Sequence, residues 1–110
     1  MALNISQLAS QMLAAALPIL TKGSGDIKEY AETEFTKIAQ RIELIETQLA
    51  SGDLSPEGAC NSLEQQKLVA KTTLSAVEGL TEEMIQDAIN AALDVVKGVV
   101  NTTLGIGLIP

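Results

Sequence analysis

Histidine and tryptophan are absent from this chain of 110 residues, and there is a single cysteine, Cys60. Without histidine the chain cannot form a Ser-His-Asp triad, a Cys-His dyad or an imidazole metal site. One cysteine allows neither an intramolecular disulfide nor a thiolate metal cluster, which suits a reducing compartment such as the cytoplasm. We therefore expect a non-enzymatic cytoplasmic protein with no catalytic residues, no cofactor and no metal site.

Aromatic residues and positive charge are also scarce. Tyr30 and Phe35 are the only two aromatic residues, and the formal net charge is −7. Base stacking in nucleic-acid binding needs aromatic side chains, and an acidic surface repels the phosphate backbone. Nucleic acid is therefore not an expected partner.

Long hydrophobic runs are missing too. Polar residues, such as Gln7 in the first apolar stretch and Asp94 in the last, interrupt each stretch before it reaches the roughly 18 residues of a membrane span. No basic residue precedes the first apolar stretch, so we expect residues 1–21 to form an apolar helix of the fold rather than a secretory signal.

Helical periodicity is what the sequence does contain. No segment alternates between apolar and polar residues with a period of two, so no strand is expected. The pattern predicts a single all-α domain with helices over about 5–20, 26–50, 56–78 and 82–102, followed by a tail, 103–110. We expect the two middle helices to form a long antiparallel hairpin (26–78) that packs with the terminal helices as a four-helix bundle. Oligomerisation would supplement the small core of such a short chain.

Breaks between the predicted helices carry turn and capping residues. Gly52 suits a left-handed position after the second helix, and Ser55 with Pro56 suits the start of the third. Thr81 is the expected N-cap of the last helix. The second helix is expected to be capped by Ser24 or Asp26, and Pro18 is expected to kink or end the first.

The two middle helices each carry apolar residues at alternating spacings of three and four, which is the heptad pattern of a coiled coil. In an antiparallel hairpin the two stripes would match pair by pair, with Ile45 opposite Cys60 and Phe35 opposite Ala70. The predicted hairpin seam consists of Ala31, Phe35, Ile38, Ile42, Ile45, Leu49, Cys60, Leu63, Lys67, Ala70, Leu74 and Val77.

The same register predicts two flanking pairs of opposite charge, Arg41 with Glu64 and Glu34 with Lys71. Exposed ion pairs contribute only about 0.2–1 kcal/mol each. Their expected role is therefore to fix the register of the hairpin rather than to stabilise it.

Two seam residues have chemistry of their own. A buried lysine such as Lys67 can lose its charge and become a nucleophile, but its stem can equally cover Ile38 while the ammonium reaches water or Glu34. We favour the second interpretation. Cys60 is expected to act as a small buried apolar residue, with a reactive thiol as the alternative.

Two pairs of glutamates stand one helical turn apart, Glu29 with Glu32 and Glu43 with Glu46, as in carboxylate metal sites. Because these residues lie off the seam, we expect a solvated face.

Charge is confined to the middle of the chain, since residues 1–21 and the residues after Lys97 carry none. The apolar surface of the terminal segments exceeds what four short helices are expected to cover. We therefore expect self-association through these segments into a homo-oligomer. The predicted interface residues are Leu8, Met12, Ile19, Ile85, Ile89, Val95, Val96, Val99, Leu104 and Ile106.

Two alternatives fit the same apolar ends. One is a peripheral membrane or pore-forming protein that uses its terminal amphipathic helices, although such helices usually carry more lysine and arginine. The other is an adaptor that binds a partner protein's amphipathic helix in a groove.

Overall fold

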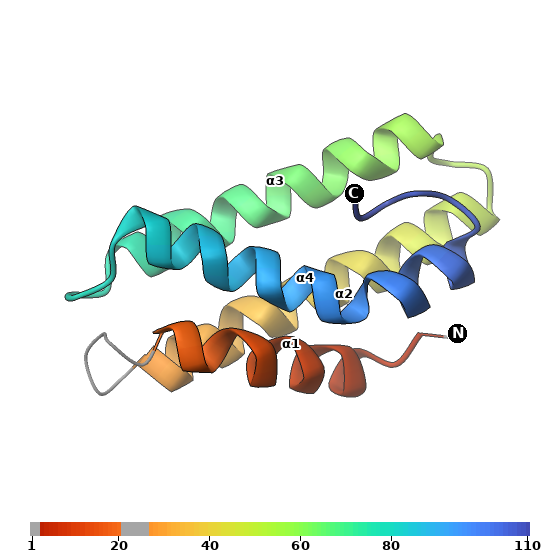
Figure 1. Ribbon diagram of the computed structural model, residues 1–110. Helices are drawn as coiled ribbons and strands as arrows, with labels where there is room; N and C mark the ends of the chain where they lie inside the picture. Colours follow the sequence, from red (N-terminus) through yellow and green to blue (C-terminus); the bar gives the residue numbers. More distant parts are fainter. Residues whose placement is uncertain (1–2, 21–26) are drawn as a thin grey trace.

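The computed structural model describes residues 3–20 and 27–110, and these residues form four α-helices and no strand. The helices are α1 (Ile5–Leu20), α2 (Ile27–Ala50), α3 (Pro56–Ser75) and α4 (Glu82–Leu104). The all-α expectation is therefore confirmed for this part of the chain, and the four helices pack together in a bundle-like arrangement (Figure 1).

Capping residues set the helix boundaries. The hydroxyl of Ser55 accepts a hydrogen bond from the Gly58 amide at 3.0 Å, and Pro56 occupies the first turn of α3. Thr81 caps α4 in the same way, since its hydroxyl accepts from the Met84 amide at 3.1 Å. Gly52 has a φ of 79°, a left-handed conformation that glycine adopts without steric cost. These predicted positions are confirmed, whereas Ser24 and Asp26 lie outside the described residues.

Two helix ends differ from the prediction, whereas α1 ends at Leu20 as predicted. Helix α3 ends at Ser75 rather than near 78, because the amides of Ala76 and Val77 bond three residues back and tighten the last turn. Helix α4 continues to Leu104 rather than 102, because Gly105, with a φ of 71°, supplies a left-handed C-cap. Pro18 does not end α1, which runs on to Leu20.

The helices are unevenly packed. Helix α1 packs extensively against both α2 and α4, and α3 packs against α2, but α3 and α4 make less contact with each other. Figure 1 shows that the C-terminal segment turns back after α4 and passes between α3 and α4. We call this segment, Gly105–Pro110, the tail.

The core runs the length of the bundle, which measures 42 × 22 × 19 Å. Every helix contributes fully buried residues at helical spacing, so each has one face inside. The largest of the fully buried side chains are Met12, Leu20, Phe35, Ile38, Ile42, Ile45, Leu74, Ile89, Val96 and Val100, with Glu34 as the one charged member.

Candidate interaction surfaces

Most of the predicted seam is buried. The seam residues of α2 from Ala31 to Ile45 are fully buried, and Leu63, Ala70, Leu74 and Val77 are buried as well. Three of the predicted residues, Leu49, Cys60 and Lys67, are only partly buried. The inner face of α3 is instead completed by Ala59 and Gln66, which the heptad stripe did not include.

The four residues of the predicted flanking ion pairs were expected to be exposed, and three of them, Arg41, Glu64 and Glu34, have other partners. Arg41 donates to the Ser62 hydroxyl at 3.5 Å and to the Gln66 side-chain oxygen at 3.4 Å, the residues two positions either side of Glu64. Glu64 itself accepts from Lys67 at 3.0 Å within α3. The long guanidinium group therefore lies against neutral side chains between α2 and α3.

Glu34 departs furthest from the prediction. It is 1% exposed rather than flanking, and its Oε2 accepts from Lys37, one turn along α2, at 3.2 Å. Its other oxygen, Oε1, is buried without a hydrogen-bond partner, and the same holds for Oε1 of the partly buried Glu46. The expectation of a solvated glutamate face, made for Glu29, Glu32, Glu43 and Glu46, therefore fails for the Oε1 atom of Glu46. Among the described residues, no group of three or more candidate ligands could hold a metal ion.

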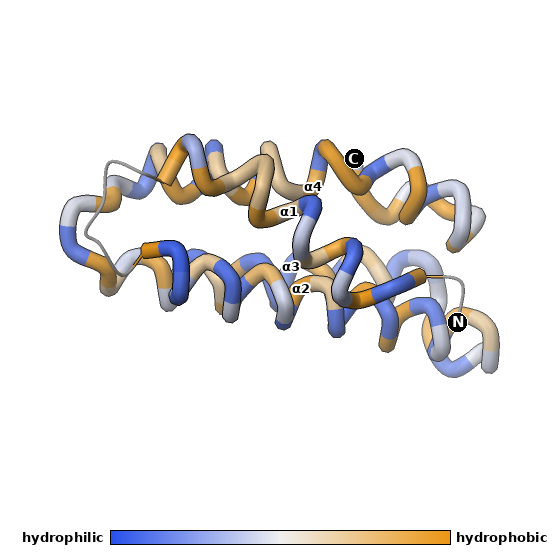
Figure 2. The backbone as a smooth tube through the Cα atoms, turned by 90° about the horizontal axis from the view of Figure 1, so that it is seen from below, coloured by the Kyte–Doolittle hydropathy of each residue, from blue (hydrophilic) through white to orange (hydrophobic). Residues whose placement is uncertain are grey.

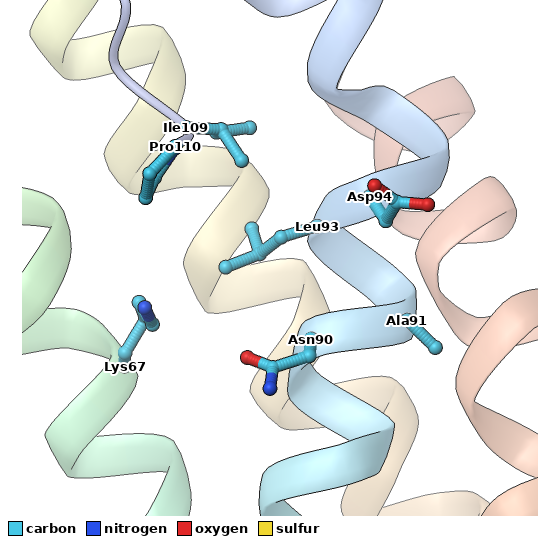
Figure 3. Close-up of a pocket in the computed structure, with 7 residues that line it drawn as sticks. All are labelled: Lys67, Asn90, Ala91, Leu93, Asp94, Ile109 and Pro110. Carbon is cyan, nitrogen blue, oxygen red and sulfur yellow. The ribbon is translucent and has the colours of Figure 1, made fainter.

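Lys67 lies beside the tail rather than inside the α2–α3 contact. Its side chain is 13% exposed, and its ammonium pairs with Glu64, not with Glu34. Figure 3 shows Lys67 on α3 and Asn90 on α4 on opposite sides of a cavity next to Ile109 and Pro110. The cavity has a volume of about 360 Å³. Cys60 is free and partly buried.

The predicted interface residues divide into two groups. Leu8, Met12, Ile85, Ile89 and Val96 are buried within the single chain, because α1 and α4 pack on each other, and α1 also packs on α2. Ile19, Leu104 and Ile106 are partly buried against the same core. An interface made of these residues would require the bundle to open. The prediction that these eight residues form an exposed interface is therefore corrected.

Val95 and Val99 are the two predicted interface residues that face solvent. They are 53% and 51% exposed and lie one turn apart on α4. The exposed Asp94 and Lys97 are close to Val95 on α4, but α1 has no charged residue and α4 has none after Lys97. In Figure 2, α1 is coloured mostly white to orange, whereas α2 and α3 alternate between blue and orange. We call Val95, Val99 and the exposed residues Gln7, Gln11, Ala14 and Pro18 of α1 the uncharged surface.

Comparison with known protein families, curated proteins and solved structures finds no match to this chain. No helix in the described part of the chain is long and apolar enough to cross a membrane.

The tail is a feature that periodicity did not predict. Leu108 and Ile109 are 2% and 4% exposed, and the Asn101 side chain bonds to both backbone groups of Ile109. The sequence carried a signal for this arrangement, namely an uncharged segment with glycines at 105 and 107 and apolar residues between and after them. The same signal predicts a segment that packs against another subunit, whereas in the structure Leu108 and Ile109 are buried against their own chain.

Proposed function

We propose that this protein is a non-enzymatic helical bundle that self-associates through its uncharged surface. The observation that carries the proposal is the exposure of Val95 and Val99 on the helix that α1 packs against. In this proposal Val95 and Val99 form the apolar centre of a contact that extends over the uncharged helix α1, with the exposed Asp94 and Lys97 at its border.

A second copy is the occupant that charge favours. The chain carries a formal net charge of −7, so two copies repel each other where their charged residues meet. Helix α1 and the last turns of α4 carry no charge, which allows two copies to approach there with the least repulsion. Gln7 and Gln11 can form hydrogen bonds across such a contact without the desolvation cost of an ion.

The α2–α3 pair would supply the rigid side of each subunit. We propose that it forms an antiparallel hairpin in the coiled-coil register expected from the sequence. The hydrogen bonds from Arg41 to Ser62 and Gln66 support this register, because they bracket the position at which Glu64 was expected to face Arg41. Buried polar contacts of this kind favour one register over its neighbours.

The test is the mass of the full chain measured by light scattering during size exclusion, over a concentration series. We expect a defined species larger than the 11.5 kDa monomer. The double variant Val95→Glu/Val99→Glu should run as a monomer with an unchanged circular dichroism spectrum. The matched control is Leu68→Glu/Val69→Glu, which places two glutamates at exposed apolar positions of α3 and should leave the assembly intact.

A wild-type chain that remains monomeric at the highest concentration would refute the proposal. The uncharged surface would then have to serve lipid or a foreign helix. Flotation with vesicles of zwitterionic and anionic lipid would test the first alternative, and titration with an amphipathic helical peptide would test the second.

A further inference from the structure

The tail occupies the space between α3 and α4 in the way that a bound peptide occupies a groove (Figure 1). The Asn101 amide nitrogen donates to the Ile109 carbonyl at 2.9 Å, and the Ile109 amide donates to the Asn101 side-chain oxygen at 3.0 Å. One side chain thus satisfies both backbone groups of one residue in the tail. Main-chain hydrogen bonds combined with buried apolar side chains are how proteins recognise extended peptides.

The hinge that leads into the groove offers little steric resistance. Gly105 has a left-handed φ of 71°, and a Cβ placed on Gly105 or Gly107 would meet no heavy atom within 4 Å. There is open space beside both residues, and glycine adopts positive and negative φ values with similar ease, as a hinge requires. Beyond Ile109 the groove opens into the cavity between Lys67 and Asn90, so the tail does not fill all the available space (Figure 3).

We propose that the α3–α4 groove is a binding site for an extended, uncharged peptide with two adjacent apolar residues, and that in the assembly it takes the tail of a second copy. The inference rests on the proposed self-association. A second copy's tail has the same Leu108 and Ile109 side chains and the same backbone groups that Asn101 bonds to in this structure. Exchange of identical segments between subunits is a low-cost route to a dimer, because it reuses contacts that already exist.

Closure within one chain has the advantage of proximity, since a short linker gives an effective concentration in the millimolar range. Exchange is therefore expected when copies are already held together, or when closure within each chain is disabled. The second condition can be created with two full-length variants. Asn101→Ala weakens the groove and keeps the tail, whereas Ile109→Asp disables the tail and keeps the groove.

Each variant alone should be free of exchanged dimers, and the equimolar mixture should give a 1:1 heterodimer in native mass spectrometry. Both variants carry Val95→Glu/Val99→Glu so that self-association through the uncharged surface does not contribute. Circular dichroism checks that each is folded. If Ile109→Asp is not folded, Ile109→Ser takes its place.

A labelled peptide with the sequence of residues 102–110 provides the second measurement. We expect saturable binding to the Ile109→Ser chain, at least tenfold weaker binding when Asn101→Ala is added, and no binding of a scrambled peptide. Folded partners that neither form a heterodimer nor bind this peptide would overturn the proposal. A heterodimer from the mixture together with a monomeric wild type would support the groove and refute the uncharged surface. An oligomeric wild type together with no heterodimer from the mixture would refute the proposed binding site between α3 and α4 and leave the proposed self-association standing.

Discussion

Replacing the buried carboxylate of Glu34 with leucine should stabilise the bundle, although it removes an ion pair. Glu34 is 1% exposed, and its Oε1 has no hydrogen-bond partner. An unsatisfied buried polar group costs about 1–3 kcal/mol. The pair with Lys37 offsets little of this cost, because the Lys37 side chain is 46% exposed and such pairs contribute about 0.2–1 kcal/mol.

Leucine has a similar length and adds no polar atom. The substitution therefore removes the cost of the unpaired buried oxygen, which is larger than the contribution of the ion pair with Lys37 that is lost. The free energy of unfolding should rise by about 1–2 kcal/mol, in line with hydrophobic replacements of buried ion pairs elsewhere. For a domain of this size the melting temperature should then rise by about 4–10 °C. Thermal and urea unfolding at neutral pH, followed by circular dichroism, would measure both quantities.

The matched control is Glu32→Leu, the same substitution on an exposed position of the same helix. A surface change of this kind should alter stability by no more than about 0.5 kcal/mol. If Glu34→Leu instead lowers the free energy of unfolding by more than 1 kcal/mol while the fold is retained, the carboxylate stabilises the core and the reasoning is wrong.

Three further predictions concern other parts of the bundle. Asn101→Ala removes both hydrogen bonds to Ile109 and should speed hydrogen exchange of the Ile109 amide at least tenfold, given about 1 kcal/mol per bond. The control is Asn61→Ala, the same substitution at an exposed position of α3 that does not line the cavity beside Ile109, and unchanged exchange in Asn101→Ala would show that the apolar contacts alone hold the tail. Ile42→Asp places a charge at a fully buried position and should abolish cooperative thermal unfolding, whereas a retained melting temperature would contradict the placement of Ile42 in the core. Thr81→Ala removes the N-cap of α4 and should lower the free energy of unfolding by about 1 kcal/mol in urea titrations, with Thr102→Ala, an exposed threonine near the other end of α4, expected to have no such effect.

Local sequence signals predicted the helices well, because helix starts and stops depend on short-range chemistry. Ser55, Pro56 and Thr81 act through their own neighbours, so their positions in the sequence were sufficient. The apolar stripes likewise identified most of the buried positions of α2, since burial follows the helical period.

Contacts between distant segments could not be predicted in the same way. Glu34 is a charged residue at a position adjacent to the seam, and only the packing of the helices against one another decides that it is buried. The tail was an uncharged segment whose cover could come from another subunit or from its own chain, and periodicity does not distinguish the two. In the structure the tail packs against its own chain, and Asn101 holds it there through two hydrogen bonds to a residue eight positions away.

The position of the tail also has a consequence for the order of folding. Its binding site lies between α3 and α4, and the site exists only once both helices have formed and packed, so we expect the tail to dock late in folding. Contacts made after the transition state change the rate of unfolding and leave the rate of folding nearly unaltered. The last six residues would then slow unfolding and so lengthen the lifetime of the folded molecule, while the rate of folding would stay nearly the same.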